Sequence, residues 1–182
     1  MASIFGHALA AYTIGKVSNI QLNPVKFSLL LIFCAVIPDA DVIMFNFGYP
    51  YLHPLGHRGF SHSILFAFLL AFCIRAIFYT KVTYFSNTGI ILFFTFLLAT
   101  LSHSFLDAMT NGGKGVGFFI PFENSRYFFS WRPILVSPLG AGRFFSEKGF
   151  RVLQNEAIYI GIPAISLLIL NYFMRRKSNR KN

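Results

Sequence analysis

The 18 residues AIYIGIPAISLLILNYFM (157–174) carry no charged side chain, and the basic tail RRKSNRK (175–181) follows them at once. About 20 apolar residues in a helix cross the hydrocarbon core of a bilayer, and Lys and Arg gather on the cytoplasmic side of such helices. The stretch therefore predicts a membrane-spanning helix with a cytoplasmic basic anchor.

The composition of the whole chain agrees with a membrane protein. Of its 182 residues, 55% are hydrophobic, 24 are Phe and only 12% are charged, whereas a soluble domain has roughly 25% charged residues. Three further apolar segments cover residues 27–45, 60–80 and 88–108. We expect an all-α integral membrane bundle of about four membrane helices plus a short N-terminal helix, forming a single domain over residues 1–182.

The first apolar segment and the N-terminus are less regular than the last helix. FSLLLIFCAVIP (27–38) is shorter than a full crossing, so this segment is expected to be re-entrant or packed inside the bundle. No basic residue precedes Lys16, which argues against a cleavable signal peptide. Cys34 and Cys73 lie within apolar segments and suit buried thiols better than a disulfide.

The charge of the chain points to a membrane surface. The formal net charge is +10, but the basic residues are scattered along the chain, so anionic lipid headgroups explain them better than a nucleic acid does. We expect membrane lipids as partners, without nucleic acid and without an obligate protein partner.

The segment 109–156 predicts an extramembrane loop or lid, because it is rich in Gly and Pro and also in aromatic residues that favour the membrane interface. With a cytoplasmic tail, alternating spans place 109–156 and 46–59 outside and Lys16, Lys26 and Lys81 inside. The six Lys and Arg residues of 109–156 fit this arrangement less well.

This arrangement brings the ionisable residues of the apolar segments to the same, outer ends of their helices. A charge buried in hydrocarbon costs several kcal/mol, so such residues are normally paired, metal-bound or in contact with water. A common metal ion would serve all of them, and the residues concerned are Asp39, Asp41, His57, His62, His103 and Asp107.

Two acidic motifs have metal-ligand spacing. His103 and Asp107 are four residues apart, so they share one helix face and can converge on one ion. Asp39 and Asp41 follow Pro38, which interrupts the preceding helix, so one can bind a metal while the other orients a histidine or a water molecule. The alternatives are a His–Asp hydrogen bond at a helix end for the first pair and helix capping for the second.

The motif HRGFSHS (57–63) supplies two more histidines and an arginine. His57 is expected in a loop and His62 in the first helical turn, so both can face one pocket. Arg58 suits an anionic substrate or transition state, because its guanidinium pairs with phosphate oxygens. The alternatives are a solvated His57 and a headgroup anchor at Arg58.

Five segments together resemble one bacterial family. They are GHALAAY (6–12), IPDAD (37–41), HRGFSHS (57–63), HSFLDAMTNGG (103–113) and IPFENSRYFFSWRPILVSP (120–138). In this order they are similar to the YdjM family of bacterial inner-membrane proteins, described as LexA-regulated, membrane-bound, metal-dependent hydrolases. Ser61 stands where Thr is common in that family. The resemblance implies metal-site residues His7, Asp39, Asp41, His57, His62, His103 and Asp107.

The order of these motifs is also similar to the zinc-dependent phospholipase C and P1 nuclease group. By that likeness Asp107 would bridge two zinc ions, and His103 with His57 or His62 would be terminal ligands. His7 would bind the second ion. The chain lacks the N-terminal Trp of that group and has no HxxxE after Asp107, which argues against a third zinc.

These features favour a membrane-bound metal-dependent hydrolase, a phosphoesterase that cleaves a lipid or membrane-proximal phosphoester with a metal-activated water. We expect one or two Zn²⁺ ions, or Mn²⁺, with Asp39 or Asp41 as general base and Arg58 as phosphate contact. The expected location is the bacterial inner (plasma) membrane, multi-pass, with the site on the periplasmic face. A transporter that uses the His/Asp cluster and an inactive structural or stress-response membrane protein are the alternatives.

Overall fold

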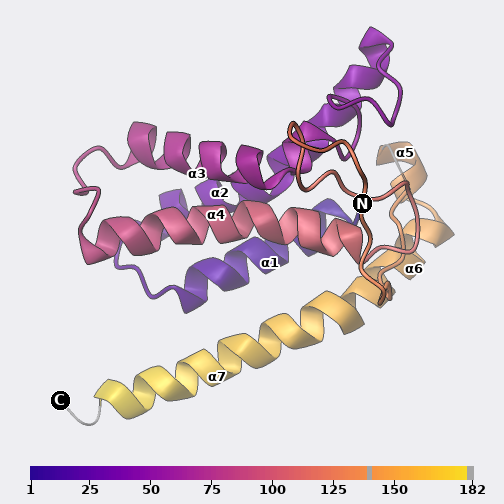
Figure 1. Cartoon of the computed structure of the whole chain (residues 1–182). Coiled ribbons are helices and arrows are strands. Elements are labelled where there is room, and N and C mark those ends of the chain that lie inside the picture. The colour runs from indigo at the N-terminus through magenta and orange to yellow at the C-terminus, as the bar shows by residue number, and fades with distance from the viewer. Residues whose placement is uncertain (139–140, 180–182) are drawn as a thin grey trace.

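A computed structural model describes residues 1–138 and 141–179, and the regular secondary structure of these residues is helical (Figure 1). The all-α prediction is therefore confirmed. The elements in chain order are α1 (Ile4–Val17), α2 (Pro24–Val36), the 3₁₀ helix η1 (Ile37–Phe47), the single 3₁₀ turn η2 (Phe60–His62), α3 (Ile64–Phe78), α4 (Asn87–Ala108), α5 (Ala141–Phe144), α6 (Glu147–Glu156), the π-helical turn η3 (Ala157–Gly161) and α7 (Ile162–Asn179).

Helices α1 to α4 form a bundle around α4, which packs against each of the other three, and α7 packs along α1 at the edge of this bundle (Figure 1). Capping side chains set where the helices begin. The hydroxyls of Ser3, Ser63 and Ser86 accept hydrogen bonds from the amides of Gly6, Phe66 and Gly89, at the starts of α1, α3 and α4. Such caps satisfy amides that have no partner within the helix.

Small side chains allow close helix packing in the centre of the bundle. Ala11, Ala35, Ala71 and Ala99 are fully buried, one from each of the four helices. Small residues at helix contacts are typical of membrane bundles, where packing replaces the hydrophobic effect. The outer surface of the helices carries exposed Leu, Ile and Phe side chains, as expected where lipid is the solvent.

Three helical stretches are long and apolar enough to cross a membrane: Pro24–Phe47, Asn87–Ala108 and Glu147–Lys177. The apolar helix α3 is shorter, with 15 residues. The expectation of about four membrane helices thus agrees approximately with three long helices and one short one.

The first apolar segment is longer than the sequence indicates. Pro38 ends the α-helical hydrogen bonding, because it lacks an amide donor, but the chain continues in a 3₁₀ conformation to Phe47. The helical stretch from Pro24 then has 24 residues. The expectation of a segment shorter than a full crossing is therefore wrong, because Pro38 suggested an end that the chain does not have. The alternative of packing inside the bundle agrees with the contacts of α2 with α1 and α4.

The segment 109–156 folds over one end of the bundle (Figure 1). Paired backbone hydrogen bonds join Val116 and Tyr127, and the amide of Asn111 donates to the carbonyl of Ile134. Its last ten residues form α6, so this part of the expected loop is helical. Both cysteines are free thiols; Cys34 is buried as expected, whereas Cys73 lies on the exposed surface of α3.

Replacing Ala99 by Leu should lower the free energy of unfolding in detergent by about 1–3 kcal/mol, because no space is free around this buried side chain. The neighbouring Leu98 is half exposed, so Leu98→Met should change stability by less than about 0.5 kcal/mol. Thermal unfolding of the two variants in parallel measures the difference, and equal stability would contradict the packing described here.

Candidate metal centre

Four ligand-type side chains converge at the loop-covered end of the bundle. They come from three elements: Asp39 from η1, His62 from η2, and His103 with Asp107 from successive turns of α4. His62, His103 and Asp107 are fully buried, and the side chain of Asp39 is 12% exposed. The sequence therefore places three buried polar groups and one accessible carboxylate around a single point.

The local backbone around His62 depends on Gly59. A Cβ atom at this position would lie 2.1 Å from the carbonyl oxygen of Pro54, so only glycine allows the loop to pass here. The amide of Phe60 donates to the same carbonyl, and the next turn is η2. This tight path turns His62 into the bundle, where the hydroxyl of Ser104 donates to the His62 carbonyl oxygen.

The spacing of the four donor atoms fits a tetrahedral ion. His62 Nε2 lies 3.0 Å from His103 Nε2 and 3.5 Å from Asp107 Oδ2. Asp39 Oδ1 lies 3.7 Å from His62 Nε2 and 3.4 Å from His103 Nε2. Zinc bonds of about 2.0–2.1 Å give a tetrahedron with edges of about 3.3 Å. With the 3.9 Å between His103 Nε2 and Asp107 Oδ2, the observed separations lie on both sides of such an edge.

Hydrogen bonds on the far side of each imidazole fix its tautomer. His103 Nδ1 lies 2.7 Å from the carbonyl oxygen of Ala35, which can only accept, so this nitrogen carries the proton. His62 Nδ1 lies 2.9 Å from the Ser61 hydroxyl and 3.2 Å from Asp41 Oδ2, to which it can donate. Both Nε2 atoms are then free to present lone pairs to the centre, as in carboxylate–histidine–metal arrangements.

The centre requires a positive charge. Asp39 Oδ1 and Asp107 Oδ2 are buried without a hydrogen-bond donor, and they face the two imidazole lone pairs. Burial alone would lower the pKa of His62, but hydrogen bonds to Asp107, Asp39 and Asp41 outweigh it and raise this pKa to about 10. The Arg58 guanidinium, 3.0 Å from Asp107 Oδ2, offsets one of the two carboxylates. A proton or a metal ion must offset the other, and four converging donors fit the metal ion.

Asp41 lies behind the centre and orients the groups in front of it. Its Oδ1 is 2.6 Å from His57 Nδ1, and its Oδ2 accepts hydrogen bonds from the Arg58 amide and the Ser61 hydroxyl. Together with Asp39 and His57 it forms a second group of close ligand-type atoms. Because both Asp41 oxygens already have partners, this carboxylate holds the 57–62 loop in place.

Arg58 is directed at Asp107. Its Nε lies 3.0 Å from Asp107 Oδ2, and its terminal nitrogens donate to the Thr110 hydroxyl and the Gly112 carbonyl. The side chain is fully buried, and the backbone φ of 61° is in the left-handed region. The cost of this conformation, about 1–3 kcal/mol, indicates that the surrounding contacts determine the position of Arg58.

His7 and the N-terminal residues close the other side of Asp107. The His7 ring stacks on His103 with centroids 3.8 Å apart, and its Nε2 is 3.5 Å from Asp107 Oδ1. Both His7 nitrogens are buried without a hydrogen-bond partner. The amide of Ala2 donates to Asp107 Oδ1 at 2.8 Å. Asp107 thus presents one oxygen to the four-donor group and the other to His7.

The structure brings together all seven residues that the family resemblance implied, but only four of them face the central point. His62, His103, Asp107 and Asp39 supply the four converging atoms, His7 stacks beside them, and Asp41 with His57 lies behind them. The remaining histidine, His53, is apart from this group, where its Nδ1 accepts a hydrogen bond from the Leu55 amide.

Three supporting residues were missed by sequence reasoning. Glu156 is buried and accepts hydrogen bonds from both the amide and the hydroxyl of Ser3, which fixes the start of the chain beside Asp107. Thr110 and Ser61 bind Arg58 and Asp41. These three residues are polar within an apolar chain, which was a signal, but it did not identify partners 20 or more residues away.

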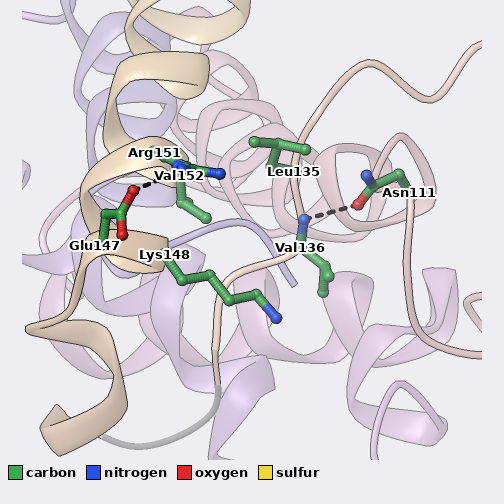
Figure 2. A pocket seen from close by; sticks show the side chains of 7 residues that line it. All are labelled: Asn111, Leu135, Val136, Glu147, Lys148, Arg151 and Val152. Atoms are coloured by element: carbon green, nitrogen blue, oxygen red, sulfur yellow. Dashed lines mark hydrogen bonds and ion pairs between the residues drawn. The ribbon is translucent and has the colours of Figure 1, made fainter.

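A cavity of about 600 Å³ lies between α6 and the residues Asn111, Leu135 and Val136 (Figure 2). Figure 2 shows the Glu147–Arg151 ion pair on one side of it and the hydrogen bond from the Val136 amide to Asn111 on the other. None of the four converging residues lines this cavity. It is therefore separate from the metal-type centre.

Comparison with known proteins gives a family. The protein-family model described as "YdjM inner membrane protein" matches residues 1–179 of the chain. The chain belongs to the YdjM family. A curated YdjM-type relative is the inner membrane protein YbcI of Escherichia coli (strain K12), 34% identical over 177 residues, which are 97% of this chain and 100% of YbcI. No solved structure matches this YdjM-family chain. The resemblance to the family is confirmed, whereas no comparison shows a relation to the phospholipase C and P1 nuclease group.

Purified protein should bind zinc, and His103→Gln should remove it, because this change takes away a buried nitrogen that faces the other three donors. His53→Gln is the matched control, since His53 lies outside the centre. Metal content by mass spectrometry after dialysis checks this. Equal zinc in wild type and His103→Gln protein would contradict the assignment of His103.

Asp41→Asn should weaken zinc affinity by about 10–100-fold without abolishing it, because it alters the hydrogen bonds that orient His62 and His57. A chelator competition titration measures this ratio. Complete loss of zinc would instead make Asp41 a direct ligand.

Proposed function

We propose that this membrane protein is a metal-dependent hydrolase that cleaves phosphoesters at the membrane. The observation that carries the proposal is the uneven exposure of the four donor residues: the side chains of His62, His103 and Asp107 are fully buried, whereas that of Asp39 is 12% exposed. Catalytic zinc sites keep three protein ligands and one open position, while structural sites are closed by four. Three buried ligands with a carboxylate at the open side match the catalytic type.

In this proposal His62, His103 and Asp107 hold the ion, and Asp39 lies beside the open position. A divalent ion in this place supplies a Lewis acid and lowers the pKa of a water molecule toward neutrality. The His₂Asp donor set suits Zn²⁺, with Mn²⁺ as the alternative. The other oxygen of Asp107, Oδ1, lies 3.5 Å from His7 Nε2 but already accepts a hydrogen bond from the Ala2 amide, so the proposal is limited to one ion.

Asp39 acts as the general base in the proposed reaction. Its Oδ1 has no hydrogen-bond donor in the protein and is 3.4 Å from His103 Nε2, so a water molecule at the open position lies within its reach. Oxygen of this water forms a bond to phosphorus while Asp39 takes its proton. The phosphorus–oxygen ester bond breaks, and the leaving alcohol receives the proton that Asp39 took, so that Asp39 is restored and one water is consumed for each bond cleaved.

Arg58 positions Asp107 rather than the phosphate. The sequence suggested a direct phosphate contact, but Arg58 is fully buried and its nitrogens face Asp107, Thr110 and Gly112. We propose that it holds the Asp107 carboxylate at the angle that the centre needs. The charge on the substrate phosphate would then be neutralised at the open side of the centre.

The location we propose is multi-pass in the inner membrane with the centre at the periplasmic face. The three helices with membrane-spanning length support this, as does the basic tail Arg175–Lys177 at the opposite end of the last helix from Glu156. The loop-covered end, which contains the centre, then lies outside the cytoplasm.

The Asp39→Asn variant distinguishes a general base from a fourth metal ligand at this position. If Asp39 is the base, the variant should keep its zinc but lose about 10²–10⁴-fold in the rate constant for hydrolysis of bis(p-nitrophenyl) phosphate. His53→Gln should keep both. Loss of zinc from Asp39→Asn would make Asp39 a fourth ligand, close the site and contradict the catalytic proposal.

A further inference from the structure

A groove of about 480 Å³ is lined by residues of α2 and η1 and by Ile4 at the start of α1. Its volume is within the range of small-molecule sites, roughly 300–1,000 Å³. It is lined by Ile4, Leu29, Ile32, Phe33, Val36, Ile37, Asp39 and Ala40. Asp39 is the ionisable residue in this otherwise apolar set.

The groove follows the helix axis and faces outward. Leu29, Phe33, Val36 and Ala40 recur at intervals of three or four residues, so they form one continuous face. Seven residues of α-helix and four of 3₁₀ helix give this face a length of about 18 Å. The side chains of Leu29 and Phe33 are 63% and 46% exposed, within the helical stretch of membrane-spanning length. The groove is therefore open to membrane hydrocarbon.

Asp39 joins this groove to the metal-type centre. The same carboxylate lines the groove and places its Oδ1 3.4 Å from His103 Nε2. The other three donors are fully buried, so the side of Asp39 is the accessible side of the centre. The cavity beside α6 gives no such access, because none of the four donors lines it.

We propose that the groove holds a hydrocarbon chain of a membrane-lipid phosphoester, which enters sideways from the bilayer and brings its phosphate to the centre beside Asp39. This inference rests on the proposed hydrolase function and names its substrate class. The apolar lining lets the chain stay in a hydrocarbon-like environment while the negative phosphate meets the positive charge that the centre requires. A water-soluble phosphoester uses the centre but not the groove.

Photo-crosslinking tests occupancy of the groove without any reaction. The probe is phosphatidic acid with a diazirine in one acyl chain, incorporated in lipid nanodiscs with the full-length protein. Peptides from residues 27–40 should carry at least five times more label than peptides from residues 162–174, which are also exposed to lipid. Ala40→Phe should abolish this excess, because Ala40 is an exposed small residue inside the groove. Cys73→Phe, an exposed small residue on α3, should preserve it.

Even labelling of both segments would overturn the proposal. So would a dimer mass by native mass spectrometry together with exclusion of the probe from residues 27–40, which would assign the groove to a second copy of the chain.

Kinetic measurements test the lipid substrate class independently of the proposed hydrolase function. For zinc-loaded protein, the ratio of kcat/KM for dioleoyl phosphatidic acid to that for bis(p-nitrophenyl) phosphate should fall at least tenfold in Ala40→Phe and stay unchanged in Cys73→Phe. An unchanged ratio in Ala40→Phe would overturn the groove as a substrate site. If wild-type protein cleaves neither compound but still labels residues 27–40 selectively, the hydrolase function fails while lipid binding in the groove stands.

Discussion

The structure depends on the repulsion between four lone pairs inside an apolar bundle. Two imidazole nitrogens 3.0 Å apart and two buried carboxylate oxygens face one point, and Arg58 is the cation beside one of these oxygens. In a medium of low dielectric such a group is strongly unfavourable unless a cation lies among the donors. The bundle and its covering loop therefore form a suitable binding site for a positive ion. The surrounding hydrogen bonds orient the four donor atoms toward that site.

The centre is built from residues that are far apart in the chain. Asp41 fixes the 57–62 loop, Arg58 links that loop to Asp107, and Ala35 at the end of α2 fixes His103. Each contact joins two elements of the bundle end. A change at any of these positions would move a donor relative to the others, so the centre is a property of the whole helix packing and not of one motif.

Much of the fold was predictable from the sequence, because apolar segments ended by Asn, Ser and basic residues define helices in a membrane chain. The length of the first helix was not predictable. Pro38 normally ends a helix, and only the fold shows that the backbone continues as a 3₁₀ helix to Phe47. The start of α6 inside the expected loop was missed as well, although its polar and apolar residues alternate with helical spacing, because the Gly, Pro and aromatic residues of 109–138 gave the whole segment the character of a loop.

For the site, residue types and the spacing of His103 and Asp107 identified candidates but not their partners. Sequence could not show that Arg58 faces Asp107, because its direction follows from a left-handed backbone conformation that local patterns do not encode. The division between Asp39 at the accessible side and Asp41 behind the centre also depends on how η1 packs against the 57–62 loop. Long-range contacts of this kind emerge only in three dimensions.

The hydrogen bonds between Ser3 and Glu156 connect the centre to the last helix. Glu156 lies at the top of the apolar stretch that continues into α7, Ser3 follows Ala2, and the amide of Ala2 binds Asp107. Apolar helices tilt when the bilayer is thinner than they are long. The start of the chain thus ties two helices together, because Ser3 binds Glu156 where the last apolar stretch begins and Ala2 binds Asp107 of α4. A change of tilt in α7 would therefore pull, through these hydrogen bonds, on a carboxylate of the candidate centre.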